Sequence, residues 1–402
     1  MKDKQLFSGL FFINFCITLG FGVLDSFFSL YVISTGVREV MLGIPFAFYA
    51  VTKIFFSVPL GALSDKIGRK RVLSFAIITY SFVSVSYLFY PGLEAAVILR
   101  VIQGGACAMF RPVMLSYIGD MTESGKRSTV TGTFDISFYG ALGAGPVLGG
   151  FIRNYYGFNG VFVFLSLLCF ISLLVTLFYI KDTGQYTGNQ SGGMNGLPVS
   201  ALSRNTKALL VFIFGRACGI SAIAAFMPVY FEKNLHFSSL ETGFVLSVSM
   251  VFMTVCLRPL GKLGDVVPRS FLVVLGGFAV AVTYLFLPFA VNFTDVVFIC
   301  IFTGVFGALS QPSSTALLLD EGGKAGMGRT FGYFNLFMNA GFAFGALTGS
   351  VLSGIFGVNA VFCFAGVVGI LSTAVFCLHQ TDTATVNAGA ATFKEGARNN
   401  DI

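Results

Sequence analysis

The stretch GALSDKIGRKRV, residues 61–72, gathers charged side chains into one short segment of a mostly apolar chain. Residues 40–62 and 72–91, on either side of it, are apolar runs of about 20 residues, the length that an α-helix needs to cross a bilayer. The charges of the segment are those of Asp65, Lys66, Arg69, Lys70 and Arg71. Because ionised groups are costly inside a membrane, we predict that this segment is a short turn at the membrane surface between two transmembrane helices.

The composition extends this interpretation to the whole chain. Of its 402 residues, 55% are hydrophobic and 11% are charged, whereas about 25% of residues are charged in soluble domains. The mean hydropathy is +0.83. Apolar runs of spanning length lie near residues 6–33, 40–62, 72–91, 93–119, 128–152, 158–180, 207–231, 240–262, 270–291, 296–319, 330–353 and 358–379. We therefore predict an all-α membrane protein with twelve transmembrane helices, the first of which is retained rather than cleaved as a signal peptide.

Lysine and arginine are distributed unevenly between the two sides of these predicted helices. Outside the helices, only Arg38, Arg153 and Lys233 fall on the side opposite to the N-terminus. Because loops rich in Lys and Arg remain in the cytoplasm, we expect both termini to be cytoplasmic in a multi-pass protein of the cell inner (plasma) membrane. The net charge of +7 reflects this asymmetry, so it gives no reason to expect a nucleic-acid partner.

Residue types that bind metals give no indication of a metal site or a cofactor. The eight cysteines fall within predicted helices and contain no C-x-x-C pair, which is typical of small packing residues. The two histidines, His236 and His379, are too few and too far apart for a zinc site. We therefore expect no metal and no cofactor.

A segment rich in Gly, Ser, Asn and Thr, residues 182–206, predicts a flexible cytoplasmic linker. It separates an N-terminal six-helix bundle, 1–181, from a C-terminal one, 207–379, which is followed by a polar and disordered tail, 380–402. Shifting the second half back by 200 positions aligns Pro59 with Pro259, Asp65 with Asp265, Arg69 with Arg269, Gly104 with Gly304, Pro112 with Pro312 and Asp120 with Asp320. We predict two pseudo-symmetric bundles, the layout of transporters that rock around a central site.

Residues 61–70 match every fixed position of G-x-L-x-D-x-x-G-R-[KR], the loop signature of the major facilitator superfamily, and the whole helical chain resembles that family. The resemblance implies the major facilitator fold and a role in transport. In that family the loop Asp and Arg form a charge network with an acid at the inner end of helix four, and the Asp faces the start of helix eleven. The resemblance therefore implies a conformational latch made of Gly61, Asp65, Gly68, Arg69 and Asp120.

The second half repeats this implied latch incompletely. It retains Asp265, Arg269 and Asp320, but Pro268 stands where the first half has glycine. We therefore expect the second latch to be degenerate.

The fourth predicted helix carries RVIQGGA, residues 100–106, which is similar to the R-x-x-Q-G motif of the same family. Asp25 in the first helix and Arg100 in the fourth lie at equal depth, roughly 10–12 Å from the outer surface at 1.5 Å per residue. We expect them to meet across the cavity, on the same side as Gln103. A carboxylate that gains and loses a guanidinium partner changes its affinity for protons, so this pair predicts proton coupling. The alternative is a permanent ion pair that only fixes helix packing.

Other ionisable residues within the predicted helices are expected near the same substrate cavity. Arg111 and Asp135 have matched depths near the inner face, which predicts a static ion pair between neighbouring helices. Lys53 and Arg216 have no evident acidic partner. The excess of positive charge would suit an anionic or zwitterionic substrate, although Lys53 can also reach the membrane surface by snorkelling.

The fifth predicted helix contains GALGAGPVLGG, residues 140–150, which resembles the antiporter motif of drug-efflux branches of the family. The matching positions are Gly132, Gly145, Pro146, Gly149 and Gly150, whereas Ala141 replaces one glycine. Small residues let helices approach closely, and Pro146 is expected to kink the helix. A general packing face of small residues would explain Gly145 and Gly149 equally well. The intact G-P-x-x-G-G core favours efflux over uptake.

The sequence is compatible with other functions to different degrees. The segment GDMTESGKRS resembles a phosphate-binding loop, but Gly119 is one position too early and Arg127 replaces the Ser or Thr that the motif needs. An ATP-driven pump or membrane enzyme is therefore disfavoured. Uptake of a sugar, organic anion or similar solute is the main alternative, and a sensor or assembly protein is disfavoured by the short loops. We predict a monomeric, non-enzymatic exporter whose partners are a small molecule, protons and membrane lipid.

Overall fold

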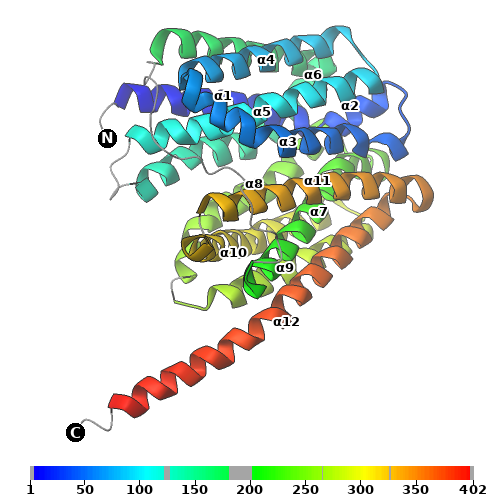
Figure 1. The fold of residues 1–402 in the computed structure, drawn as a ribbon. Coiled ribbons are helices and arrows are strands. Elements are labelled where there is room, and N and C mark those ends of the chain that lie inside the picture. The colour runs from blue at the N-terminus through cyan, green and yellow to red at the C-terminus, as the bar shows by residue number, and fades with distance from the viewer. Residues whose placement is uncertain (1–3, 122–126, 181–201, 265, 326, 399–402) are drawn as a thin grey trace.

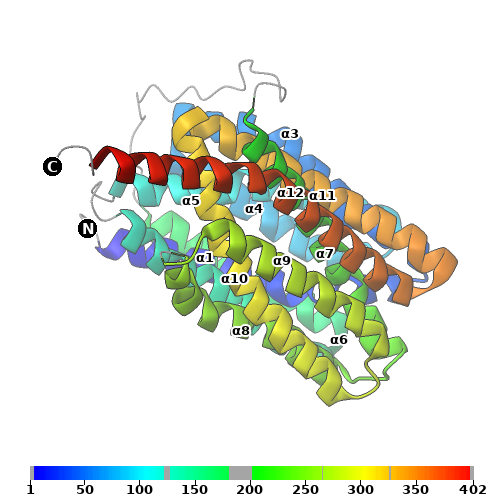
Figure 2. The same cartoon turned by 90° about the horizontal axis from the view of Figure 1, so that it is seen from below.

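The computed structural model describes residues 4–121, 127–180, 202–264, 266–325 and 327–398, and this described chain is helical without any strand. Its N-terminal half forms one layer and its C-terminal half a second layer beside it, as Figure 1 shows. Both termini lie at the same end of the molecule in Figures 1 and 2. We call the opposite end, where α6 turns at Gly157, the distal end.

The N-terminal layer consists of α1 (Lys4–Asp25), α2 (Phe28–Ser34), the 3-10 turn η1 (Glu39–Met41), α3 (Gly43–Ile67), α4 (Arg69–Phe89), α5 (Leu93–Met121) and α6 (Arg127–Tyr179). The C-terminal layer consists of α7 (Arg204–Lys233), α8 (Ser239–Leu263), α9 (Arg269–Phe286), the turn η4 (Leu287–Phe289), α10 (Phe293–Ala325), α11 (Met327–Phe356) and α12 (Val358–Arg398). Residues 182–201 of the predicted linker lie outside the described residues, and its last three residues belong to α7. This helix begins after Ser203, whose hydroxyl accepts from Thr206 N at 3.1 Å.

Eleven of the described helices are long and apolar enough to cross a membrane. One of them, α6, contains Gly157 at φ 65°, in the left-handed region that favours glycine, so the chain turns there and α6 contributes two crossings. Gly357, at φ 82°, occupies the equivalent turn between α11 and α12. The predicted all-α membrane fold with twelve crossings is confirmed.

Two predicted helix boundaries differ from the structure. The first run is not one helix, because it breaks between Asp25 and Phe28, where Ser26 Oγ donates to Gly22 O at 2.7 Å and competes with the backbone ladder. The last helix does not end at residue 379. Its helical backbone continues to Arg398 through an alanine-rich segment without proline, so the predicted disordered tail is wrong for the described residues.

The internal repeat appears in how the helices cross. A Cβ atom placed on Gly104 of α5 would lie 2.7 Å from the carbonyl oxygen of Tyr49 in α3. A Cβ atom on Gly304 of α10 would lie 2.4 Å from the carbonyl oxygen of Ser249 in α8. Glycines that match in the sequence alignment therefore contact carbonyls that also match, so both halves contain the same close helix crossing.

Candidate functional site

Ion pairs join the two halves at the distal end. Lys233 Nζ lies 2.7 Å from Glu39 Oε1, and Ser353 Oγ donates to Glu39 Oε2 at 3.1 Å. Arg153 donates to Glu232 through both terminal nitrogens, with Nη2 2.9 Å from Oε2. Bidentate pairs of this kind are the strongest charge-assisted hydrogen bonds. We call Glu39, Arg153, Glu232 and Lys233 the distal gate.

Backbone contacts close the same end. A Cβ atom on Gly150 of α6 would lie 2.4 Å from Ser239 O, and one on Gly243 of α8 would lie 2.3 Å from Pro146 O. On the other side of the molecule, the Gly43 N–H of α3 donates to Ser350 Oγ of α11. The Val147 N–H of α6 donates to Ser247 Oγ of α8 at 3.0 Å, a further hydrogen bond between the halves in the distal half of the bundle. The structure therefore represents a state that is closed at the distal end.

A cavity of about 330 Å³ lies between the two halves. Residues of α7, α8, α9 and α10 form most of its wall, and α1 and α6 of the N-terminal half complete it. The wall is largely apolar and includes Met227, Met250 and Met253, whose flexible thioethers adapt to ligands of different shape. Its ionisable charges are those of Asp25 and Arg216. The volume is within the range of small-molecule sites, so we take this central cavity as the candidate substrate site.

Asp25 and Arg100 form an ion pair at the edge of the central cavity. Arg100 Nη1 lies 2.7 Å from Asp25 Oδ1, so the two residues that were predicted to meet do meet. The Asp25 side chain is 46% exposed, whereas that of Arg100 is 2% exposed. The Arg100 guanidinium also lies 3.6 Å from the centroid of the Phe28 ring, a close cation–π contact. The carboxylate is therefore accessible from the cavity while its cationic partner is not.

The polar atoms behind this pair are poorly satisfied. Arg100 Nε and Nη2 are buried and bond to no other described residue, and the same holds for Gln103 Oε1. Each such atom costs about 1–3 kcal/mol when it is left without a partner. Asp25 is therefore the group that offsets the cost of burying the positive charge of Arg100. Gln103 is 2% exposed and is not part of the cavity wall, contrary to expectation.

The predicted ion pair between Arg111 and Asp135 is wrong. The Arg111 guanidinium instead lies 4.0 Å from the ring centroid of Phe138, one turn along α6 from Asp135, although its charge still acts on Asp135 over a longer distance. Lys53 Nζ lies 5.3 Å from the ring centroid of Tyr49. None of Lys53, Arg111 and Asp135 lines the central cavity. Although Arg111 and Asp135 have equal depths in their helices, their side chains do not form an ion pair.

The predicted latch of the first half is only partly within the described residues. Gly68 has φ 98° and joins α3 to α4 in a conformation that favours glycine. Arg69 is buried, and its Nη1 donates to the carbonyl oxygen of Ser116 in α5 at 2.9 Å. The surroundings of Gly61 and the side chains of Asp65 and Asp120 lie outside the described part, so the latch stays a prediction.

The second half retains one contact of the implied latch. Arg269 Nη1 lies 2.7 Å from Asp320 Oδ2, at the end of the bundle where the termini lie. Asp265 lies outside the described residues. Pro268 precedes α9 at φ −53°, so the turn is made without the positive φ of Gly68.

The glycines of the antiporter-like motif contact two different helices. A Cβ atom on Gly145 would lie 2.7 Å from the carbonyl carbon of Gly22, and one on Gly149 would lie 2.9 Å from Val23 O, both in α1. Gly150 faces α8 of the other half, as described above. The surroundings of Gly132 lie outside the described part. The motif therefore packs α6 tightly against α1 within its own half and against α8 across the halves.

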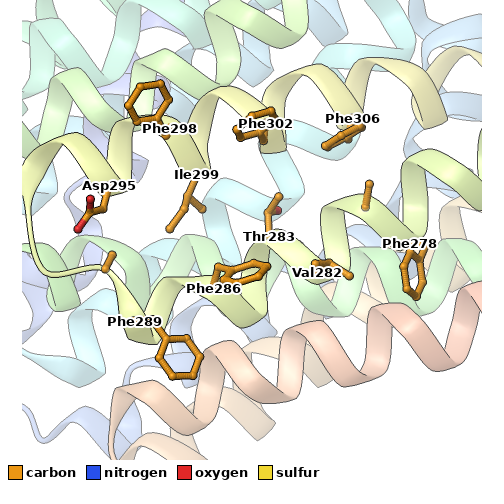
Figure 3. Close-up of a pocket in the computed structure, with 12 residues that line it drawn as sticks. Phe278, Val282, Thr283, Phe286, Phe289, Asp295, Phe298, Ile299, Phe302 and Phe306 are labelled. Carbon is orange, nitrogen blue, oxygen red and sulfur yellow. The ribbon is translucent and has the colours of Figure 1, made fainter.

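A second hollow, of about 600 Å³, runs between α9 and α10 on the exposed flank of the C-terminal half (Figure 3). Six phenylalanines line it: Phe278, Phe286, Phe289, Phe298, Phe302 and Phe306. Asp295 lies at one end, where its carboxylate accepts from the N–H groups of Val291 and Asn292. Ile299 lines both this flank groove and the central cavity, and the hydroxyls of Thr283 and Thr303 lie 2.9 Å apart beside it. One layer of side chains thus separates the two spaces.

Comparisons with known proteins agree with this architecture. The family model described as Major Facilitator Superfamily matches residues 10–255 and 209–396. The multi-drug resistance efflux pump PmrA of Streptococcus pneumoniae is 25% identical over 367 residues, which cover 87% of this chain and 89% of PmrA. The multidrug resistance protein MdtG of Proteus mirabilis is 24% identical, with the same two coverages of 87% and 89%. The crystal structure of the nucleoside transporter NupG matches with a TM-score of 0.76 at 15% identity, over 93% of this chain and 99% of that chain.

These matches and the central cavity between two six-helix layers define a membrane transporter. The chain belongs to the Major Facilitator Superfamily, as the loop signature at residues 61–70 predicts. Proteins of this family are transporters rather than enzymes, which confirms the predicted class.

The distal gate was not predicted from the sequence. In the sequence, Arg153 and Lys233 are two of the few bases on that side, which indicates topology but no pairing partner. Their acidic partners, Glu39 and Glu232, lie at the ends of neighbouring apolar runs, in the other half from the base that each one binds. A signal for these ion pairs is nevertheless present in the sequence, because each pair joins opposite charges at helix ends of the same depth in different halves.

Proposed function

We propose that this protein exports a small amphiphilic molecule across the cytoplasmic membrane by alternating access, in exchange for protons. The observation that carries the proposal is the position of Asp25, which is exposed in the wall of the central cavity and paired with a buried arginine. The antiporter-like motif of α6 and the relatives named as multidrug efflux proteins support the outward direction. The uneven distribution of Lys and Arg supports cytoplasmic termini, so the distal end faces outwards.

Asp25 is the group that carries the proton in this proposal. While the pair is intact, the carboxylate neutralises the buried charge of Arg100. A proton on Asp25 breaks the ion pair and leaves Arg100 without its counter-charge, so protonation and rearrangement around the cavity are energetically linked. Because the distal end is closed here, a full cycle must also separate the distal gate and the α6–α8 crossing.

We expect Asp25→Asn to abolish proton flux that is evoked by substrate. The purified protein would be reconstituted in liposomes with a pH-sensitive dye inside, and a proton gradient would be imposed. Amphiphilic cations, sugars and organic anions would then be screened, at a temperature where the variant remains folded. Asp25→Glu keeps an ionisable carboxyl group and is expected to retain part of the flux.

Counterflow, the exchange of labelled for unlabelled substrate without a proton gradient, is the folding control. The Asp25→Asn substitution removes the titrating group but leaves the rest of the cavity, so the variant should still exchange substrate. Substrate movement that produces no proton flux in the parent, and that is unchanged in the variant, would overturn proton exchange. Accumulation of substrate together with protons would instead establish uptake.

The distal gate gives a second expected result. Arg153→Glu places two acids together where a half-buried bidentate pair now lies, and charge-assisted hydrogen bonds are worth about 1.5–3 kcal/mol. We expect transport to fall roughly tenfold or more, and the charge-swapped double variant Arg153→Glu/Glu232→Arg to recover most of it. Arg38→Glu makes the same charge change at an exposed distal residue that forms no ion pair in the described chain, and it should have little effect. Equal losses in both single variants would contradict the gate.

A further inference from the structure

We propose that Arg216 is the cargo-recognition residue of the central cavity and that the cargo is an amphiphilic organic anion. This inference rests on the proposed transport through that cavity and names the substrate class. It follows from an inventory of the charges that the sequence places inside the membrane. In the structure, some of these cations are paired with an acid or lie outside the central cavity, whereas Arg216 lines the cavity.

Arg258 lies near the inner end of α8 and outside the cavity wall. Of the four other cations inside the membrane, three are unavailable to a ligand. Arg100 is buried behind Asp25 and paired with it. Arg111 lies over the Phe138 ring and Lys53 lies near the Tyr49 ring, and both are outside the cavity wall. The charge of Asp25 is likewise balanced by Arg100. The pair therefore contributes no net charge to the cavity.

Arg216, near the middle of α7, is different from these cations. It lines the central cavity, and in the described chain its guanidinium forms neither an ion pair nor a hydrogen bond with another residue. The ionisable side chains that act on it electrostatically are the phenols of Tyr139 and Tyr284. Asp135 acts on Tyr139 but is not among the groups that act on Arg216. Within the described chain, no carboxylate therefore compensates this charge.

An isolated cation inside a membrane protein is costly, because the hydrocarbon core does not solvate a charge as water does. A ligand that brings one negative charge to Arg216 removes this cost, and the rest of the wall accommodates an apolar body. A cationic ligand would instead add like charge to a cavity that is already positive. The chemistry of the cavity therefore selects a molecule with an anionic group and an apolar part.

The same charge balance has a directional consequence. With an anion bound, the cavity is electrically neutral, whereas the empty cavity carries the charge of Arg216. A membrane potential that is negative inside draws a positive empty carrier inwards. Return of the empty carrier is thus favoured, and so is export of the anion. A proton on Asp25 during the return would add to this effect.

The test uses three probes of matched shape and different charge: 4-phenylbutyrate, 4-phenylbutyramide and 4-phenylbutylamine. Equilibrium binding of each radiolabelled probe to the purified full-length protein would be measured. We expect the parent to bind the carboxylate at least tenfold more tightly than the amide, and the amine most weakly. Arg216→Gln should bind carboxylate and amide equally, and Arg216→Lys should keep part of the preference. Lys53→Gln removes an intramembrane charge outside the cavity and should keep all of it.

Tight binding of the amine, equal binding of amide and carboxylate by the parent, or an unchanged preference in Arg216→Gln would overturn the proposal. Binding of the amide also shows that Arg216→Gln is folded. Failure of proton exchange is separable from these outcomes, because Asp25→Asn should lose proton flux and still prefer the carboxylate. If the parent prefers the carboxylate but shows no proton flux, the inference of an anionic cargo stands and the proposal of proton exchange is rejected.

Discussion

Gly150→Val is expected to disfavour closure of the distal end strongly and to lower transport. Even a Cβ atom at this position would lie 2.4 Å from Ser239 O and 3.2 Å from the Cα of Gly243, and backbone atoms cannot move aside as a flexible side chain can. Overpacking typically costs about 1–3 kcal/mol. Because this contact joins the two halves, the cost falls on the closed state alone, whose population should drop about 5- to 150-fold.

Gly140→Val is the matched control for this prediction, because Gly140 lies on the same helix and a Cβ atom there has no neighbour within 4 Å. Spin labels on the exposed distal residues Tyr155 and Val291 would report the separation of the halves. Gly150→Val should shift the distance distribution to larger values, whereas Gly140→Val should leave it unchanged. An unaltered distribution in Gly150→Val would show that the crossing does not limit closure.

Asp25→Asn should destabilise the protein more than Arg100→Met does. Removing the acid leaves a fully buried guanidinium without its counter-charge, and breaking a buried pair in this way costs about 3–5 kcal/mol. Removing the base leaves a carboxylate that is 46% exposed to the cavity, where it can be solvated or protonated. Methionine also retains an apolar contact with the Phe28 ring.

Thermal unfolding of the variants in one detergent would test this order. The double variant Asp25→Asn/Arg100→Met contains neither charge, so its midpoint should lie above that of Asp25→Asn alone. This rescue by a second substitution is the signature of an uncompensated charge rather than of lost packing. A midpoint of Arg100→Met at or below that of Asp25→Asn would contradict the asymmetry in burial.

The fold was largely predictable from the sequence, because hydropathy and the spacing of matched residues depend on local chemistry. The repeat found by shifting the chain reappears in the contacts of Gly104 and Gly304. The contact of Asp25 with Arg100 was also predicted, because depth along a helix follows directly from its rise per residue. The break after Asp25 was not predicted, since neither proline nor glycine marks it.

The errors at the site have a common physical cause, which is that sequence position gives the depth of a side chain but not the direction in which it points. Arg111 and Asp135 share a depth, yet Arg111 turns to the face of Phe138. The distal gate was missed for the same reason, because its pairs depend on how two bundles meet. Arg216 could be counted as an excess charge, but only the cavity wall shows that it faces the cargo.

The flank groove between α9 and α10 bears on how this protein should be purified. Its lining extends over residues 278–290 on one side and 295–306 on the other, about 16 Å at 1.5 Å per residue, which is half of a hydrocarbon core of about 30 Å. This is the reach of a single acyl chain from one leaflet, and phenylalanine rings line the path. Detergents with long alkyl tails should therefore preserve the protein better than short-tailed ones of the same headgroup, because only a long tail covers the groove along its whole length.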